Sequence, residues 1–341
     1  MINKNTSFFI IIIISLFWFL VFYLNNSDSN QKSNQFVFSG HTMGTTYEIK
    51  IDNISFDKQK ILEKGVDSVL NHINQSMSTY IPDSEISFIN KFDGPSIIVS
   101  NSFNDVLSAS IYYNKITKGA FDVTVKPLLE IWGFRGNPII ERPDKIKIKN
   151  VMQYVGSDKF SYNSDDKLLI KNNSKVQFDF GAIAKGYAVD QISLYLQNLG
   201  HNKHYVEIGG EIVCKGKKWY IGIAHPELDS NQGYKTIVLF NHAVATSGTY
   251  NQSFEIDDFE YSHIFDSRIG EPSKNSVISV TVISDKCINS DALATSLKVL
   301  DKDKGLTLID SIEGVECMFI VKEEQELKNY YSKNFSDFFA N

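Results

Sequence analysis

The chain has 341 residues, of which 43% are apolar and 22% charged, and its formal net charge is −6. These are the proportions of an ordinary globular protein with a substantial core. With a negative net charge and no basic run, the sequence gives no indication of nucleic-acid binding. Cys214, Cys287 and Cys317 are far apart and form no C-x-x-C pair, so neither a zinc site nor a disulfide framework is supported. We expect three small buried side chains.

The N-terminus is predicted to anchor the chain in a membrane. Residues 8–24 read FFIIIIISLFWFLVFYL without a charge, close to the lower limit for crossing a bilayer. We therefore expect a membrane anchor or uncleaved signal over 1–24, a polar Ser/Asn-rich tether over 25–34 and a folded domain over 35–341. Lys4 and the terminal amine favour an N-terminus inside, which puts the domain on the outer, periplasmic side of the cytoplasmic membrane. A small-x-small pattern at Ser27-Asp28-Ser29 leaves cleavage open.

Periodicity and turn residues predict mixed secondary structure. Helices are expected over 57–77, 84–90, 102–118, 143–153, 187–199, 289–300 and 304–312. Ile61, Val66 and Leu70 should lie on the buried side of the first. Strands are expected over 36–51, 176–180, 204–208, 219–224, 236–240, 243–247, 276–283 and, closing the fold, 315–321, with a hairpin over 160–170. Strands neither alternate regularly with helices nor gather at one end. This indicates one α+β domain, with a largely antiparallel sheet and packed helices.

One stretch, VQFDFGAIAKGYAVD over 176–190, combines a carboxylate at a strand end, a turn between Gly181 and Gly186, and a helix start. Exposed turn amides and helix N-termini favour phosphate, so the stretch could hold an anionic ligand. The alternative is an ordinary strand–turn–helix whose glycines only make the turn.

Other groups in the chain could take part in chemistry. Asp291 and Thr295 are four residues apart on one helix face, and their oxygens suit Mg²⁺. The alternative for Asp291 is a helix cap. His263, in SHIFD, could take a proton from an attacking hydroxyl, although a lone loop histidine is more often only solvated. Tyr80, in MSTY, offers an aromatic face or is simply packed in its loop.

Eight motifs in order give a more specific indication: HTMGTTY, MSTYIPDSEIS, GAFDVTV, DFGAIAKGYAVD, EIGGE, ATSGTY, SHIFD and NSDALAT. In these the chain closely resembles the ApbE family of FAD:protein FMN transferases, over about residues 36–322. The resemblance implies an enzyme that uses Mg²⁺ and FAD to attach FMN to a Thr of an acceptor protein through a phosphoester, releasing AMP. It also implies that the acceptor is a subunit of a membrane redox complex.

The resemblance further implies roles for individual residues. His263 would be the catalytic histidine. The metal would lie between the side chains of Asp291 and Thr295 and the backbone carbonyl of Ala182. The FAD site would be lined by Met43, Tyr80, Ala120, Phe121, Asp122, Asp179, Lys185 and Ile264.

The chain departs from the family pattern at a few positions. Ser267 and Val123 stand where the family often has Pro, and Glu211 stands where Asn or Asp is usual. Many relatives are lipoproteins, whereas no Cys follows the apolar segment of this chain. Two other activities remain open: hydrolysis of FAD to FMN and AMP by the same site, and FAD carriage without chemistry. Asp291, Thr295 and His263 together count against pure carriage, because flavin binding needs neither a metal nor a base.

Overall fold

The computed structural model describes residues 35–226, 233–248, 253–256, 259–324 and 326–340. Its centre is an eight-stranded sheet in the order β1-β2-β6-β7-β10-β15-β16-β17, in which every neighbouring pair is antiparallel. The strands are β1 (Gln35–Thr42), β2 (Thr45–Asp52), β6 (His204–Ile208), β7 (Glu211–Lys215), β10 (Ala243–Gly248), β15 (Val277–Ser284), β16 (Glu316–Glu323) and β17 (Glu326–Tyr331). The expected α+β class with a largely antiparallel sheet is confirmed.

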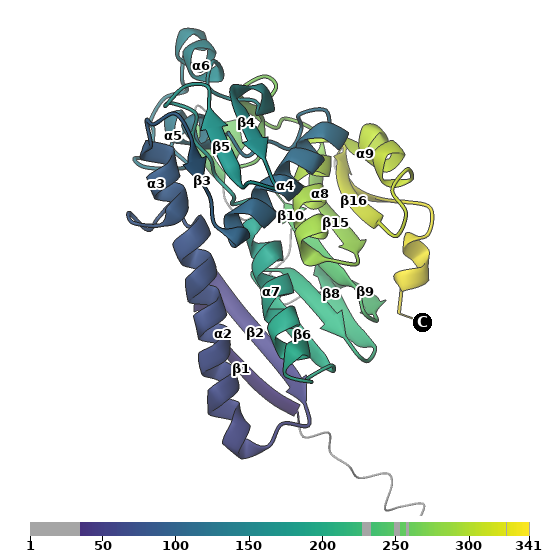
Figure 1. Cartoon of the computed structure of the whole chain (residues 1–341). Coiled ribbons are helices and arrows are strands. Elements are labelled where there is room, and N and C mark those ends of the chain that lie inside the picture. Colours follow the sequence, from purple (N-terminus) through teal and green to yellow (C-terminus); the bar gives the residue numbers. More distant parts are fainter. Residues whose placement is uncertain (1–34, 227–232, 249–252, 257–258, 325, 341) are drawn as a thin grey trace, which may run out of the picture.

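Helices cover one face of this sheet, where α2, α7 and α8 pack against the strands and against each other (Figure 1). The helices are α2 (Phe56–Met77), α3 (Glu85–Lys91), α4 (Asn101–Ile116), α5 (Lys126–Ile131), α6 (Lys145–Met152), α7 (Ala184–Asn198), α8 (Cys287–Leu300) and α9 (Lys302–Ile309). Short 3-10 turns lie at Ser157–Lys159 and Phe335–Phe338. The main core lies between the helices and the sheet, and includes Val66, Val189 and Leu297. Burial of such apolar surface is the principal force holding the layers together.

The remaining strands form small sheets around this centre. A ribbon of β8 (Trp219–Ala224) and β9 (Gly233–Leu239) adds apolar side chains to a second core with β7, β10, β15 and β16. The others are β3 (Ile97–Ile98), β4 (Phe160–Asn163) and β5 (Leu168–Lys171) in one sheet, β11 (Ser253–Ile256) with β12 (Phe259–Ser262), and β13 (Phe265–Asp266) with β14 (Glu271–Pro272). A third core, around the fully buried Trp132, joins α5 and α6 to Tyr261 and Phe265.

The expected strand over 176–180 is wrong, although its alternation is real. Val176 and Phe178 are buried as predicted, but the segment pairs with no strand of the described chain. Instead, the Asn90 side chain replaces a ladder partner: its amide donates to the Phe178 carbonyl at 2.8 Å, and its oxygen accepts from the Phe178 N–H at 2.6 Å. A side-chain amide satisfies the buried backbone as a neighbouring strand would.

Three further expectations need correction. Helix α7 begins at Ala184, three residues before its predicted start, and α8 begins at Cys287, two residues before. Helix α5 and strands β3, β7, β11 to β14 and β17 were not predicted, and because β17 follows β16, 315–321 does not close the fold. Ile61, assigned to the buried side of α2, is 66% exposed, and Leu62 is buried in its place.

All three cysteines are buried and unpaired, as expected. No helix within the described residues is long and apolar enough to cross a membrane, and the apolar run 8–24 and the tether 25–34 lie outside those residues.

Candidate functional site

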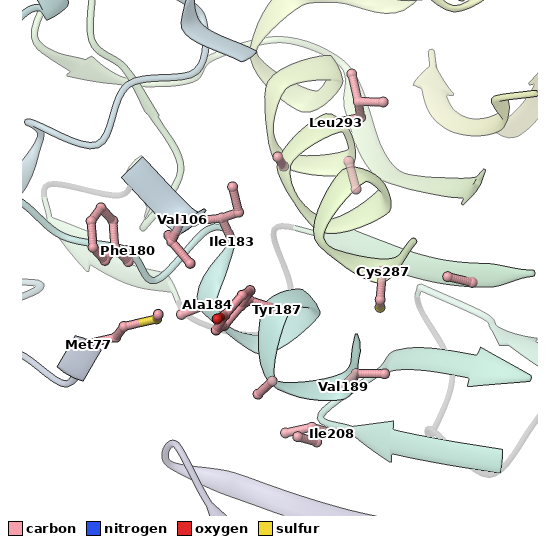
Figure 2. Close-up of a cluster of buried hydrophobic side chains, with 14 of the residues drawn as sticks. Met77, Val106, Phe180, Ile183, Ala184, Tyr187, Val189, Ile208, Cys287 and Leu293 are labelled. Carbon is pink, nitrogen blue, oxygen red and sulfur yellow. The ribbon is translucent and has the colours of Figure 1, made fainter. Parts of the chain in front are cut away.

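The turn at 181–183 lies where helices α7 and α8 meet. The Gly186 N–H, in the first turn of α7, donates to Asp291 Oδ2 of α8 at 2.9 Å. A Cβ atom on Gly186 would lie 2.4 Å from the Cys287 carbonyl oxygen and 2.8 Å from the Asp291 Cβ. Gly186 therefore does more than make a turn, because only glycine lets the two helices come this close. Figure 2 shows this first turn of α7, with Ala184 and Tyr187, beside the start of α8 at Cys287.

The N-terminus of α8 is capped from α7. Asp190 accepts hydrogen bonds from the backbone N–H groups of Cys287 and Ile288, both at 2.9 Å. Burial raises the pKa of Asp190 to about 6, against the lowering effect of these two bonds. Asp291 is the fifth residue of α8 and does not cap that helix, so the alternative interpretation of Asp291 as a cap is wrong. Because Asp190 takes the cap, the Asp291 carboxylate is directed at α7.

Lys185, Glu211 and Asp291 form a buried charged group. Lys185 Nζ lies 2.6 Å from Glu211 Oε2, and the Glu211 side chain is only 3% exposed. Burial raises the pKa of Glu211 to about 8 and also raises that of Asp291, while Lys185 acts in the opposite direction on both. Burial disfavours the charge on Lys185, but the two carboxylates outweigh it and raise the pKa of Lys185. Two carboxylates and one ammonium leave one surplus negative charge when all are ionised.

The oxygens at this place fit a hard divalent cation. Asp291 contributes a buried carboxylate, which accepts from the Gly186 N–H, and Ala182 lies in the turn 181–183 just before α7. Thr295 lies one turn further along α8, where its Oγ1 is 3.1 Å from Ser247 Oγ of β10. Oxygen ligands and surplus negative charge favour Mg²⁺. Glu211 Oε2 already has Lys185 as its partner, so the carboxylate of Asp291 carries the surplus charge at this place. The described residues contain no cluster of three or more His, Cys, Asp or Glu suited to a metal, so such a site depends on mixed ligands.

On the other side of the turn, Asp179 forms a salt bridge with Arg135. Arg135 Nε donates to Asp179 Oδ2 at 2.8 Å and its Nη2 lies 3.3 Å from Oδ1. Asp179 Oδ1 also accepts from the Gly181 N–H at 2.8 Å. The guanidinium lies 5.2 Å from the Tyr80 ring centroid, and Tyr80 is 74% exposed, so it is not packed in its loop. Sequence reasoning missed Arg135. Its Nε and Nη2 are engaged by Asp179, and its Nη1 donates to the Phe134 carbonyl at 3.1 Å, so Arg135 fixes Asp179 beside the turn and adds positive charge there.

The GAFD segment, residues 119–122, is hydrogen-bonded to Asn114 of α4. Asn114 Nδ2 donates to the Phe121 carbonyl at 2.8 Å and to Asp122 Oδ2 at 3.0 Å. Asp122 Oδ1 accepts from the Thr124 N–H and hydroxyl, and burial raises the pKa of Asp122. The side chains of Ala120 and Phe121 are buried. This segment therefore offers a ligand mainly its backbone.

His263 is half-buried between β12 and β13, and its ring centroid is 6.5 Å from that of Phe134, the neighbour of Arg135. Ile264 beside it is buried, and its carbonyl accepts from the Ser273 N–H at 2.8 Å. Ser267 Oγ donates to the Gly119 carbonyl at 2.6 Å, so the serine found in place of proline joins this hairpin to the GAFD segment.

Met43 is the remaining predicted residue. It lies at the β1–β2 turn, where its φ of 50° and the 77° of Gly44 fit a two-residue hairpin turn, and it packs against the main core. Hydrogen bonds and ring contacts connect Tyr80, Asp179 and Asp291 to the turn 181–183 and to Arg135, whereas Met43 is placed only by its packing against the main core.

Comparisons with known proteins identify the family of this chain. Residues 43–319 match the ApbE family. The chain is 35% identical over 319 residues to a Vibrio cholerae protein named FAD:protein FMN transferase, covering 90% of this chain and 94% of that protein. A Haemophilus influenzae protein of the same name is 35% identical over 286 residues, 80% of this chain and 82% of its own.

Solved structures give the same result. The flavin transferase ApbE from Vibrio cholerae superposes with a TM-score of 0.82 at 35% identity, covering 90% of this chain and all of that one. The apo form of the Pseudomonas stutzeri flavinyl transferase ApbE gives 0.81 at 31% identity, with 90% and 97% covered. The chain belongs to the ApbE family.

Proposed function

We propose that this chain is a Mg²⁺-dependent FAD:protein FMN transferase, which moves FMN from FAD to a Thr of an acceptor protein and releases AMP. That it is a transferase follows from its curated relatives. One observation carries the proposal: a single turn, 181–183, has Arg135 with Asp179 on one side and Lys185 with Asp291 on the other. Two cationic side chains and a carboxylate suited to a metal are what a pyrophosphate needs for recognition and cleavage.

In this reaction the Thr oxygen bonds to the FMN phosphorus and the bond to the AMP phosphate breaks. We assign His263 to accept the hydroxyl proton on an imidazole nitrogen, since an activated hydroxyl is the nucleophile such a transfer requires. Lys185 would contact the phosphates, and Arg135, paired with Asp179, would add positive charge that balances charge on the leaving AMP. Asp291, Thr295 and the Ala182 carbonyl would hold Mg²⁺, which when bound polarises the phosphates. Met43, Tyr80, Ala120, Phe121, Asp122, Asp179 and Ile264 would complete the FAD site.

The rest of the chain would place this chemistry at the membrane. We propose that residues 1–24 anchor the chain in the cytoplasmic membrane and that 25–34 tether the catalytic domain, 35–341, on the periplasmic side. The charge-free run at 8–24 supports the anchor. The acceptor would then be a subunit of a membrane redox complex whose flavin domain lies on the same side. Retention of the full chain in the membrane fraction with an intact N-terminus tests the anchor, and release of a shortened chain would refute it.

The activity is tested with the full chain in detergent, supplied with FAD, Mg²⁺ and an acceptor domain that carries a candidate Thr. Mass spectrometry should find FMN added to the acceptor and an equal amount of AMP, with no addition to an acceptor whose Thr is replaced by Val. FMN and AMP without labelled acceptor would indicate a pyrophosphatase instead, and intact FAD would indicate a carrier.

A variant at Asp291 tests the metal site separately. Asp291→Ala should lower turnover by more than about 100-fold and weaken Mg²⁺ binding measured by calorimetry. Asp303→Ala is the matched control, because Asp303 is an exposed carboxylate on α9, and it should change neither quantity. Mg²⁺ affinity unchanged in Asp291→Ala would refute the metal site without bearing on flavin transfer itself.

A further inference from the structure

The end of the domain where β1 begins also carries the start of α2 and the loop after α7. Gln35 pairs with Asp52 across the β1–β2 hairpin, and its side-chain amide donates to Asp52 Oδ1 at 3.0 Å. The Asp52 N–H donates to the Lys203 carbonyl at 3.1 Å. Helix α2 starts at Phe56, four residues after Asp52. The strand end that follows the tether therefore lies beside these two segments, at the lower end of Figure 1.

Three large apolar side chains are exposed at this end: Phe56 at 88%, Ile61 at 66% and Leu199 at 50%. A Cβ atom on Gly65 of α2 would lie 1.8 Å from the Tyr195 hydroxyl of α7, so these two positions abut. Helices α2 and α7 run in opposite directions along their contact (Figure 1). Ile61, one turn before Gly65, and Leu199, one turn after Tyr195, therefore both lie toward this end of the helix pair.

Lysines surround these apolar side chains. Lys58, Lys60 and Lys203 are all exposed. Lys58 is close enough to His201, in the loop after α7, that its charge adds to burial in lowering the pKa of His201. Asp52, the acid nearest to Gln35, is neutralised by Lys217 at 2.8 Å. Asp57, exposed beside Phe56, offsets one of the three lysine charges, so on a chain of net charge −6 this end keeps a positive surplus.

We propose that this end, formed by Phe56, Ile61, Leu199, Lys58, Lys60 and Lys203 and called here the docking face, rests on the anionic lipid headgroups of the bilayer. The proposal depends on the membrane anchor proposed above. Basic side chains attract anionic lipid, and exposed apolar side chains enter the interfacial layer. The ten polar residues 25–34 limit how far the domain can lie from the anchor, since a polar coil of that length has a root-mean-square span of about 17 Å. The face is thereby kept at high effective concentration near lipid, so a weak contact suffices.

Docking would set the height of the site above the membrane. Helix α2 has 22 residues and so spans about 33 Å from Phe56 to Met77. Tyr80, which contacts Arg135 of the site, follows three residues after Met77. An upright domain would thus present its site roughly 30 Å above the headgroups. The acceptor Thr must then be offered at that height, which identifies the partner as a domain that stands well clear of the bilayer.

The test uses the full chain in lipid nanodiscs with an environment-sensitive fluorophore on Ser55→Cys, next to Phe56. The three native cysteines are buried, so labelling is selective. Ser68→Cys is the matched control, because it is exposed on α2 about 18 Å further from the face. In discs containing phosphatidylglycerol, headgroup-proximal spin-labelled lipid should quench the probe at 55 at least about twofold and leave the probe at 68 unchanged.

Two variants test the apolar and the basic side chains of the docking face separately. Phe56→Ser should reduce quenching at 55, and the triple variant Lys58→Glu, Lys60→Glu, Lys203→Glu should abolish it. Discs of phosphatidylcholine alone should behave as the triple variant does. In every case the chain should still co-elute with the discs through its anchor. Flavin transfer to a soluble acceptor domain should stay unchanged, because none of these residues belongs to the site.

Co-elution with an unquenched probe at 55 would overturn the docking and leave the anchor standing. Equal quenching at 55 and 68 would also overturn it, since the domain would then lie on its side. A probe at 55 shielded from solvent but not quenched by lipid would assign the face to a protein partner or a second copy instead. Failure to co-elute would overturn the anchor, and the docking with it.

Discussion

Replacing Gly186 by alanine tests the contact between α7 and α8 directly. On helix propensity alone, Gly186→Ala should stabilise the protein by about 1 kcal/mol, because alanine is the better helix former. The structure predicts the opposite, a loss of stability. The new Cβ would lie 2.4 Å from the Cys287 carbonyl oxygen, which belongs to the backbone of α8 and cannot rotate away. Reaching an ordinary contact distance requires the helices to part by about 1 Å.

Overpacking of this kind costs about 1–3 kcal/mol. It also strains the hydrogen bonds that Asp291 and Asp190 make between the two helices. We expect a net loss of about 2 kcal/mol in the free energy of unfolding, measured by urea denaturation followed through tryptophan fluorescence. A displacement of this size beside a reacting phosphate should lower turnover by about 100-fold.

Gly222→Ala is the matched control, because no atom lies within 4 Å of the Cβ built there. Its stability should stay within about 0.5 kcal/mol of the parent. A Gly186→Ala protein as stable as the parent or more stable would refute the reasoning, since propensity would then outweigh the contact. A destabilised variant with parental turnover and Mg²⁺ affinity would refute the link between this contact and the site.

Three further predictions follow from buried polar groups. Asp190→Ala leaves two N–H groups of α8 without an acceptor and should lower the free energy of unfolding by about 2–3 kcal/mol, measured by urea denaturation. Asp190→Asn retains one acceptor oxygen and should lower it by about half as much. Ser267→Ala removes the hydrogen bond to the Gly119 carbonyl that holds the segment next to His263 in place. It should lower kcat by about tenfold and leave the KM for FAD unchanged. A change in KM alone would contradict a positioning role for Ser267. Burial lowers the pKa of His204 to about 4, so between pH 6.5 and pH 4 its imidazole takes up a proton in the unfolded chain but not in the folded one. The free energy of unfolding should therefore fall by up to about 3 kcal/mol as the pH drops over this range. His204→Gln should remove this part of the pH dependence, and equal pH dependence in parent and variant would be inconsistent with a buried neutral imidazole.

Local patterns were enough to predict most of the fold. Strands β6 and β8 have the bounds expected from alternation, and the hairpin of β4 and β5 turns where its polar residues indicated. The error at 176–180 has a physical reason: alternation reports burial of one side of an extended segment, not the identity of its hydrogen-bond partner. Asn90, 88 residues away from Phe178, supplies that partner. No pattern within the segment itself could indicate it.

The site was predictable only in part, for a related reason. Helical spacing of Asp291 and Thr295, with the family resemblance, sufficed to place two candidate ligands on one face of α8. The pairs that orient this helix and its neighbours join residues far apart in sequence, such as Arg135 with Asp179 and Asp190 with the Cys287 N–H. The sequence offered one usable indication of Arg135, its position between Gly133 and Gly136, and both glycines do adopt positive φ.

Glu211, at a position where the sequence departs from the expected family pattern, has a defined partner in this fold. A longer carboxylate at the start of β7 reaches Lys185, on the first turn of α7, and forms a salt bridge at 2.6 Å. The ammonium is thereby held beside Asp291, whose charge also raises the pKa of Glu211. A cation that bound at Asp291 would weaken the hold of that carboxylate on Lys185. Lys185 would stay paired with Glu211, but the added positive charge beside it would attract a phosphate, so metal and nucleotide should bind more tightly together than apart.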